Sequence, residues 1–363
     1  MFFGKAIDPG AGGCWNSRSI EKEEAIPMEK KNIDFASLGF GYTQTDLRYV
    51  SNFKNGAWDE GGLTADANIT MTECACVLQY AQTCFEGMKA YTTEDGRIVC
   101  FRPDMNAARM ADSCRRLVMP VFPEDRFVDA VKQTVAANAA WVPPYGSGAS
   151  LYIRPFMFGS DAILGVKPAT EFQFRVFATP VGPYFKGGVR PLSLRVSDFD
   201  RAAPRGTGHV KAGLNYAMSL YAITDAHAQG YDENVYLDPE TRTYLEETGG
   251  ANLIFVKGNT LVTPKSDSIL PSITRRSLVY VAKEYLGMDV EERPVALAEL
   301  KDFDECGLCG TAAVISPVAS IDDHGDKITF AGFGPALQKI YNTLTGIQMG
   351  RIEPPKGWIV EIC

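Results

Sequence analysis

A lysine, a tyrosine and a glutamate stand in a pattern that suits chemistry on an aldehyde. Lys211 lies in the segment GHVKAGLNYA, Tyr216 follows it by about one helical turn, and Glu247 comes later in LEETGGANL. An amine can form an imine, a phenol can hold a ring oxygen, and an acid can keep a ring nitrogen protonated, as pyridoxal phosphate chemistry requires. The alternative is that Lys211 is a solvated loop residue, like most glycine-flanked lysines.

The segments around these residues predict how they are held. Apolar residues recur at helical spacing between Lys211 and Gly230, which suits a C-terminal cap, so the lysine is expected on the turn before a helix. Two hairpins are expected beyond it, formed by 234–237 with 243–247 and by 253–256 with 261–263. Glu247 is therefore expected at the end of a strand.

Two further segments could bind an anion. Ser272 and Thr274 are capping-type residues before a helix that runs to Gly287, and a helix N-terminus offers free amides to a phosphate. Residues 309–316 contain a glycine turn that would let backbone amides approach a ligand closely. Most helix caps bind nothing, and a strand edge is the alternative for the glycine turn.

The first half of the chain predicts mixed strands and helices. Pro103 opens a helix through Cys114 that contains Arg109, either as a solvated structural residue or as part of a site. Arg154 is an isolated charge in an apolar strand, which is usually paired or directed at a site. Further expectations are a hairpin turn at 94–96, a helix over 124–140, a closing helix over 334–350, and extended segments at 63–69, 75–80, 97–101, 151–158 and 172–179.

Length and composition predict a two-domain protein that acts on small molecules. The chain has 363 residues, enough for two cores. Its net charge of −8 argues against a nucleic-acid partner, and no apolar run reaches the roughly 18 residues that a membrane span needs. The expected divisions are a loosely ordered leader (1–32), a small N-terminal α/β domain (33–180), a Gly- and Pro-rich interdomain loop (181–191) and a large C-terminal domain (192–363).

The nine cysteines favour a reducing compartment, because their number is odd and no signal peptide precedes them. A cytoplasmic protein is therefore expected. Cys306 and Cys309 have the spacing of a redox dithiol or a zinc half-site. No second CxxC or histidine pair completes a metal site in the sequence, so no metal is expected.

From about residue 33 to its end, the chain resembles the branched-chain amino acid aminotransferases, a family of fold-type IV pyridoxal-phosphate enzymes. The resemblance is carried by many ordered matches besides the Lys211 and Glu247 segments: LQY at 78–80, FEGMKA at 85–90, FRP at 101–103, YIRP at 152–155, VGPYF at 181–185, ITR at 273–275, GTA at 310–312 and GP at 334–335. It implies an α/β (α+β) fold like that of D-amino acid aminotransferase, whose larger C-terminal domain has a β-barrel-like core.

The resemblance also implies how the cofactor, pyridoxal 5′-phosphate, is bound. Lys211 would form the imine with it and shuttle the substrate proton, Glu247 would pair with the ring nitrogen, and Tyr216 would contact the ring hydroxyl. The phosphate would be held by four residues: Arg109, Ile273, Thr274 and Thr311. Amino groups would pass by a ping-pong mechanism from leucine, isoleucine or valine to 2-oxoglutarate, giving branched-chain 2-oxo acids and glutamate.

For the substrate, the resemblance implies an apolar pocket and a carboxylate site in a homodimer. The pocket would be formed by Phe85, Tyr184 and Tyr216, with Tyr80 and Val166 contributed by a second subunit. The α-carboxylate would meet Tyr152, Arg154 and the amides of Thr311 and Ala312. No macromolecular partner other than the second subunit is implied.

The sequence departs from the family in three places. Leu214 stands where a second glycine is common, and 248–251 differs from the usual segment after the acid. The animal mitochondrial members carry a CxxC just after the Gly-Thr-Ala turn, where this chain has Ala313 and Ser316. That redox switch is therefore not carried over.

Three alternatives stay open. A D-amino acid transaminase or an aminodeoxychorismate lyase would share Lys211 and Glu247 but would shape the carboxylate site differently. A protein that binds the cofactor without transaminating could use its cysteine pair for redox sensing. A purely structural protein would bind no chromophore at all.

Overall fold

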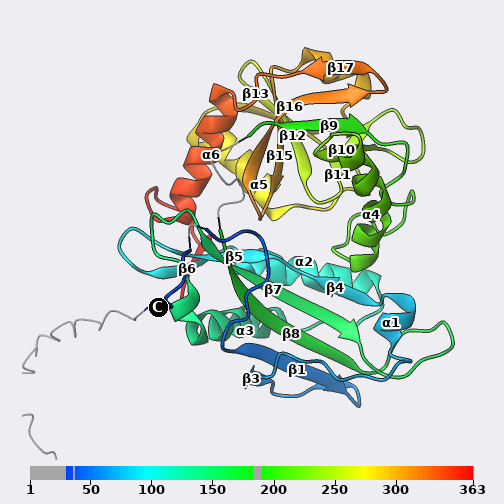
Figure 1. Cartoon of the computed structure of the whole chain (residues 1–363), viewed down its shortest axis with the longest axis vertical. Coiled ribbons are helices and arrows are strands. Elements are labelled where there is room, and N and C mark those ends of the chain that lie inside the picture. Colours follow the sequence, from blue (N-terminus) through cyan, green and yellow to red (C-terminus); the bar gives the residue numbers. More distant parts are fainter. Residues whose placement is uncertain (1–29, 36, 183–189, 363) are drawn as a thin grey trace, which may run out of the picture.

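The computed structural model describes residues 30–35, 37–182 and 190–362. Within them the strands form two nine-stranded sheets, which lie one above the other in Figure 1. The first sheet carries helices α2 and α3 (Pro103–Arg116 and Glu124–Ala137), and the second is surrounded by α4, α5 and α6 (Gly213–Ala228, Ile273–Tyr280 and Pro335–Gln348). The site lies where the two parts meet.

The first sheet is antiparallel, and its main path runs β18-β6-β5-β7-β8-β1-β2, with β3 beside β1 and β4 beside β7. Its strands are β1 (Arg48–Lys54), β2 (Ala57–Trp58), β3 (Gly62–Thr64), β4 (Thr83–Phe85), β5 (Met88–Thr92), β6 (Ile98–Phe101), β7 (Ser150–Gly159), β8 (Phe172–Val181) and β18 (Ile359–Glu361). Alternate residues on β7 and β8 bury one face against the helices, where Phe122 stacks on Phe174 at a centroid distance of 4.0 Å. The opposite face is left for polar and aromatic side chains such as Tyr152 and Arg154.

The second sheet closes into a barrel, as the resemblance implies. Its main path runs β11-β10-β9-β16-β15-β12-β13-β14, with β17 beside β16, and an additional pairing of β11 with β12 completes a ring. The strands are β9 (Leu192–Val196), β10 (Glu233–Leu237), β11 (Leu245–Thr248), β12 (Asn252–Lys257), β13 (Thr260–Pro264), β14 (Asp289–Arg293), β15 (Glu305–Gly310), β16 (Val314–Asp323) and β17 (Asp326–Thr329). Glu247 pairs with Asn252 at the closing contact, so the predicted acid sits where the ring closes.

The chain's last strand returns to the first sheet. After α6, β18 pairs with β6, with Ile359 opposite Phe101, and the ring of Trp358 packs edge-on against Phe101 at 5.6 Å. The segment 192–363, expected to form the second domain, therefore sends its C-terminal strand across to the first.

Most of the predicted elements are confirmed. The helices expected from Pro103 and over 124–140 are α2 and α3, with a 3₁₀ turn at Ala139–Trp141, and the hairpin turn at Gly96 has φ +84°. The helix expected to end at Gly287 is α5 continued by a π-helical turn (Val281–Tyr285), and α6 is the closing helix.

The extended structure expected at 75–80 is wrong. Cys76–Tyr80 forms the short helix α1, which ends at Ala81 in the left-handed region and buries Cys76 in the first core. Of 63–69, only the start belongs to a strand, β3. Alternation over so few residues did not distinguish a strand from a helix that tertiary packing stabilises. No helix among the described residues is long and apolar enough to span a membrane.

Candidate active site

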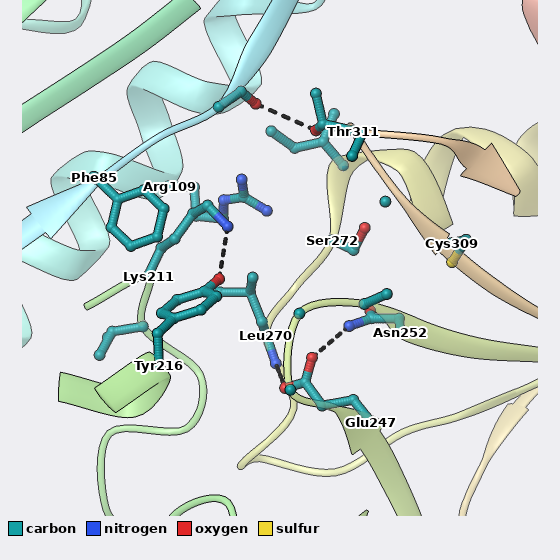
Figure 2. A pocket seen from close by; sticks show the side chains of 18 of the residues that line it. Phe85, Arg109, Lys211, Tyr216, Glu247, Asn252, Leu270, Ser272, Cys309 and Thr311 are labelled. Carbon is teal, nitrogen blue, oxygen red and sulfur yellow. Dashed lines mark hydrogen bonds between the residues drawn. The ribbon is translucent and has the colours of Figure 1, made fainter. Parts of the chain in front are cut away.

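A cavity of about 370 Å³ lies between the two sheets and receives side chains from both. Figure 2 shows Phe85 and Arg109 entering from the first part of the chain, and Lys211, Tyr216, Glu247 and Thr311 from the second. This volume is in the range of small-molecule sites. Six of the seven predicted cofactor residues therefore line one cavity: Arg109, Lys211, Tyr216, Glu247, Ile273 and Thr311.

Lys211 occupies the turn immediately before α4, as predicted. Its backbone is tied to the first part of the chain, because its carbonyl accepts from the Phe85 amide at 3.0 Å and its own amide donates to Ser113 Oγ at 3.2 Å. Its Nζ donates to the Tyr216 hydroxyl at 2.8 Å and lies 4.9 Å from the centroid of the Phe85 ring. The amine is therefore held by a phenol and an aromatic face at the cavity wall (Figure 2).

Glu247 is a buried carboxylate held by three donors. One oxygen accepts from the Asn252 side chain at 2.7 Å, and the other accepts from the Leu270 amide at 2.8 Å and pairs with Arg201 at 2.7 Å. Burial raises the pKa of Glu247 to about 7, although Arg201 and the Leu270 amide act in the opposite direction. A positive group brought beside this acid would favour its ionised form.

Arg109 is oriented by a buried acid that sequence reasoning missed. Its Nε and Nη2 donate to the two oxygens of Glu86 at 2.8 and 2.6 Å, and its Nη1 donates to the Pro271 carbonyl at 3.2 Å. The Glu86 side chain is fully buried and also accepts from Asn106. This bidentate pair fixes the plane of the guanidinium at the cavity wall.

The N-terminus of α5 faces the same cavity through Ser272 and Ile273. Ser272 caps the helix, since its Oγ accepts from the Arg275 amide at 3.2 Å, which confirms the predicted cap. Among the described residues, the amides of Ile273 and Thr274 donate to no protein acceptor. Together with Arg109 they provide an anion-binding corner.

The opposite wall carries the residues expected at the substrate. Arg154 donates to the Tyr152 hydroxyl at 2.9 Å and lies over the Phe85 ring at 4.6 Å, while its buried Nε has no protein partner in the described part of the chain. The backbone of Gly87 lies so close to Tyr152 that a Cβ there would come within 2.2 Å of the phenol oxygen. A side chain at position 87 would therefore displace the Tyr152 phenol from its place at the cavity.

Residues 311–313 form the loop of the β15–β16 hairpin at the cavity edge. Thr311, expected at the phosphate, lines the cavity, and its hydroxyl donates to the Gly87 carbonyl at 3.2 Å (Figure 2). Among the described residues, the amides of Thr311, Ala312 and Ala313 have no protein acceptor. A backbone that presents unpaired amides at a cavity suits a carboxylate or phosphate.

The remaining predicted residues lie elsewhere. Thr274 lines a smaller adjoining cavity of about 20 Å³. Tyr80 and Val166, expected from a second subunit, are exposed on their own chain and do not line its main cavity. Tyr184 lies outside the described residues, as do 1–29 of the expected leader and 183–189 of the expected loop.

Two cavity residues carried no recognisable sequence signal. Arg201 is a buried partner of Glu247 from a segment without periodicity, and Phe40, from the segment before β1, packs edge-on against Tyr152 at 5.2 Å. Both depend on tertiary contacts between distant segments. Glu86, by contrast, stands in the FEGMKA segment, where an acid between two apolar stretches could have been followed up.

Cys306 and Cys309 cannot act as a dithiol in this fold. Both lie on β15, three positions apart, so their side chains point to opposite faces of the sheet and join different cores. Burial raises the pKa of each thiol, that of Cys309 to about 12. Inaccessible neutral thiols on opposite faces argue against the redox-sensing alternative.

The chain is similar to known proteins over most of its length. Residues 83–321 match the family model for amino-transferase class IV. The branched-chain-amino-acid aminotransferase of Haemophilus influenzae is 50% identical over 341 residues, which covers 92% of this chain and 99% of the relative. The corresponding protein of Helicobacter pylori J99 is 47% identical and covers 92% of this chain and 98% of the relative.

Solved structures agree with these relatives. The branched-chain amino acid aminotransferase of Escherichia coli superposes with a TM-score of 0.75 at 29% identity, covering 88% of this chain and all of that one. The branched-chain enzyme of Thermobaculum terrenum, solved in its PLP form, superposes with a TM-score of 0.74 at 27% identity, covering 88% of this chain and all of that one.

Proposed function

We propose that this chain, which belongs to the class IV aminotransferases, transfers the amino group of leucine, isoleucine and valine to 2-oxoglutarate with pyridoxal 5′-phosphate as cofactor. One observation carries the proposal: the Lys211 amine, 2.8 Å from the Tyr216 hydroxyl, lines the same cavity as the buried carboxylate of Glu247. The relatives at 50% and 47% identity are named for this reaction, which supports the substrate class.

The residues present fit this cofactor. Lys211 offers an amine for its aldehyde, Tyr216 a hydroxyl for its ring oxygen, and Glu247 an acid for its ring nitrogen. Arg109 and the free amides at the start of α5 suit its phosphate. When bound, pyridoxal phosphate supplies the aldehyde that takes up the amino group and a ring that accepts the electron pair left at the substrate Cα.

The protein's own groups then have separate tasks. Lys211 Nζ would take the proton from the substrate Cα as a general base. Tyr216, within hydrogen-bond distance of that nitrogen, keeps it directed at the cavity. Glu247, fixed by Asn252 and the Leu270 amide, stabilises positive charge on the ring nitrogen.

The substrate lies against the first sheet in this proposal. Its carboxylate meets Tyr152, Arg154 and the free amides of the 311–313 turn, and its side chain contacts Phe40, Phe85 and Tyr216. A methylene more or less in such a pocket is worth only about 1–3 kcal/mol, so leucine, isoleucine and valine should all react.

A homodimer would complete the pocket. Leu78, Leu164 and Val166 are 59%, 84% and 88% exposed, and the Tyr80 hydroxyl donates to the Leu164 carbonyl, so α1 and the loop after β7 form one apolar surface. Exposed apolar patches of this kind mark interfaces. We therefore infer that Tyr80 and Val166 enter the partner's site; sedimentation should show a dimer, and Val166→Asp should dissociate it and lower activity.

A cytoplasmic location is part of the proposal. Cys84 and Cys114 are buried with their sulfurs 3.7 Å apart as thiols, which suits a reducing compartment. Fractionation of cells that produce the protein should find it with the cytoplasmic enzymes, and recovery from an oxidising compartment would contradict this.

The assay is direct. Purified protein loaded with pyridoxal phosphate should convert L-leucine and 2-oxoglutarate to 4-methyl-2-oxopentanoate and glutamate, and Lys211→Ala should abolish turnover. Lys283→Ala, which removes an exposed lysine that does not line the cavity, serves as the control. Steady turnover by Lys211→Ala, or a preference for D-amino acids, would overturn the assignment.

A further inference from the structure

Lys89 is a buried lysine that the reaction does not use. It lies on β5 directly opposite Tyr152 of β7, so the two side chains leave the same face of the first sheet, toward the second. Its side chain crosses to the hairpin turn of the second sheet, where Nζ donates to the Ala312 carbonyl at 2.7 Å. Lys89 is 9% exposed, and burial lowers its pKa to about 8.

Among residues 30–35, 37–182 and 190–362, no carboxylate forms an ion pair with the Lys89 ammonium. It borders the cavity of about 20 Å³ that is also lined by Thr274, Thr311 and Gln348, and no carboxylate lines this cavity in the described part of the chain. The buried Oε1 of Gln348 has no protein partner there either. A cation without a counter-charge is costly to bury, so its contact with Ala312 calls for an explanation beyond packing.

The turn that Lys89 contacts, residues 311–313, is conformationally constrained, and its backbone amides have no acceptor among the described residues. Val314, which follows the turn, has φ +65°, a conformation that is strained for a β-branched residue. Such strain persists only where the surrounding structure maintains it. Two contacts join this turn to β5 and the residue before it: Lys89 donates to the Ala312 carbonyl, and Thr311 donates to the Gly87 carbonyl. Because a peptide is planar, fixing the Ala312 carbonyl also fixes the Ala313 amide. Together with the Thr311 contact, which holds the start of the turn, it restrains the orientation of the whole 311–313 segment.

We propose that Lys89 is a positioning residue for substrate carboxylates: by holding the Ala312 carbonyl it aims the amides of the 311–313 turn at the carboxylate that Tyr152 and Arg154 meet from the other side. The inference rests on the proposed function, since it assigns the turn to carboxylate recognition. Lys89 does not line the main cavity that holds Lys211, Tyr216 and Glu247. The positive charge of Lys89 also favours an anion bound on the side of the turn that lines the main cavity.

The proposal separates substrate affinity from the chemical step. Removing Lys89 leaves Lys211, Tyr216 and Glu247 with all their contacts, so kcat at saturating substrate should change little. The KM values for leucine and for 2-oxoglutarate should rise together, because both substrates carry the α-carboxylate. General damage to the site would lower kcat and cofactor affinity as well.

The experiment compares Lys89→Met and Lys89→Arg with the wild type, each as the cofactor-loaded dimer. Lys283→Met is the matched control, because that lysine is exposed. Binding of 4-methylpentanoate, a carboxylate that cannot react, is measured by calorimetry, and KM, kcat and the visible absorbance of the bound cofactor are measured alongside. Lys89→Gln replaces Lys89→Met if the latter does not fold, with the same direction and a smaller effect.

We expect Lys89→Met to weaken 4-methylpentanoate binding and to raise both KM values by about 10-fold or more, the order expected for loss of one charged hydrogen bond. Its kcat should stay within about 3-fold of the wild type, and Lys89→Arg should recover most of the affinity. Unchanged affinity in Lys89→Met, or a joint loss of kcat and cofactor absorbance, would overturn the inference. Failure of the wild type to bind 4-methylpentanoate would instead overturn the proposed function, and the inference with it.

Discussion

Arg201 and Glu247 form a buried ion pair 2.7 Å long, with side chains only 5% and 4% exposed. Arg201 also donates to the carbonyls of Gly208 and Ser268, so it ties the segment before Lys211 to the one before α5. Lys211 and Glu247 therefore share a support, although they are far apart in sequence. Sites built from distant segments depend on such supporting contacts.

Removing Arg201 should damage the protein's stability. Arg201→Met leaves Glu247 as an unpaired buried acid, and breaking a buried pair in this way costs about 3–5 kcal/mol. Lys54→Met, which breaks the half-exposed pair with Glu171, should cost less than about 1 kcal/mol. Urea unfolding of both variants checks this, and equal losses for the two would refute the importance of the buried pair.

The stability of the cofactor-free protein should fall as pH rises through the titration of Glu247. Its pKa is raised by burial to about 7, against 4.5 for a free glutamate, so the folded state favours the protonated form. This contribution is fully present below pH 4.5 and is lost as pH rises to about 7, a change of roughly 3 kcal/mol relative to Glu247→Gln. The measurement is the free energy of unfolding of both proteins from pH 4.5 to 8. A constant difference between them would contradict the prediction.

Glu86 should be as important to folding as a core residue. Glu86→Gln removes the buried negative charge to which two nitrogens of Arg109 donate, and so leaves the Arg109 guanidinium without its counter-charge. We expect the free energy of unfolding to fall by about 3–5 kcal/mol. Asp112→Asn is the matched control, since Asp112 pairs with Arg115 on the exposed surface of α2, the helix that carries Arg109. Thermal unfolding of Glu86→Gln that coincides with that of Asp112→Asn would show that the pair does not stabilise the fold.

Phe40 should affect apolar substrates more than glutamate. It lines the cavity and packs against Tyr152, so Phe40→Ala removes apolar surface that a leucine side chain would contact. We expect kcat/KM for leucine to fall about 10-fold or more, on the scale of a lost aromatic contact, and that for glutamate to fall less. Tyr145→Ala, an exposed aromatic residue outside the cavity, is the control. Equal losses for the two substrates would argue against a role in the apolar pocket.

Local patterns were enough to predict the parts of the fold with strong signals. Helix α2 begins at a proline, Ser272 caps α5, and Lys211 precedes α4, because each depends on nearby residues. Helix α1 was mistaken for extended structure, since five residues carry too little periodicity. The return of β18 to the first sheet has no local signal at all.

The residues of the candidate site also fall into two groups, those that the sequence predicts and those that it does not. Lys211, Tyr216 and Glu247 could be proposed from residue type and spacing, and the family resemblance added Arg109, Tyr152 and Arg154. The supporting contacts could not be predicted, because Arg201, Glu86 and Lys89 act through partners 23 to 223 positions away or through backbone carbonyls. The Cys306 and Cys309 pair shows the converse: its spacing suggested chemistry that a strand with alternating faces does not allow.

The central claim is that Lys211 and its partners move an amino group from a branched-chain amino acid to a bound cofactor. The most direct test is a single half-reaction, in which excess L-leucine is added to cofactor-loaded protein without 2-oxoglutarate. The visible absorbance of the cofactor should be lost and one equivalent of 4-methyl-2-oxopentanoate per site should appear. After free leucine is removed, 2-oxoglutarate should restore the absorbance and yield one equivalent of glutamate per site. An absorbance that leucine leaves unchanged, with no oxo acid formed, would contradict the claim.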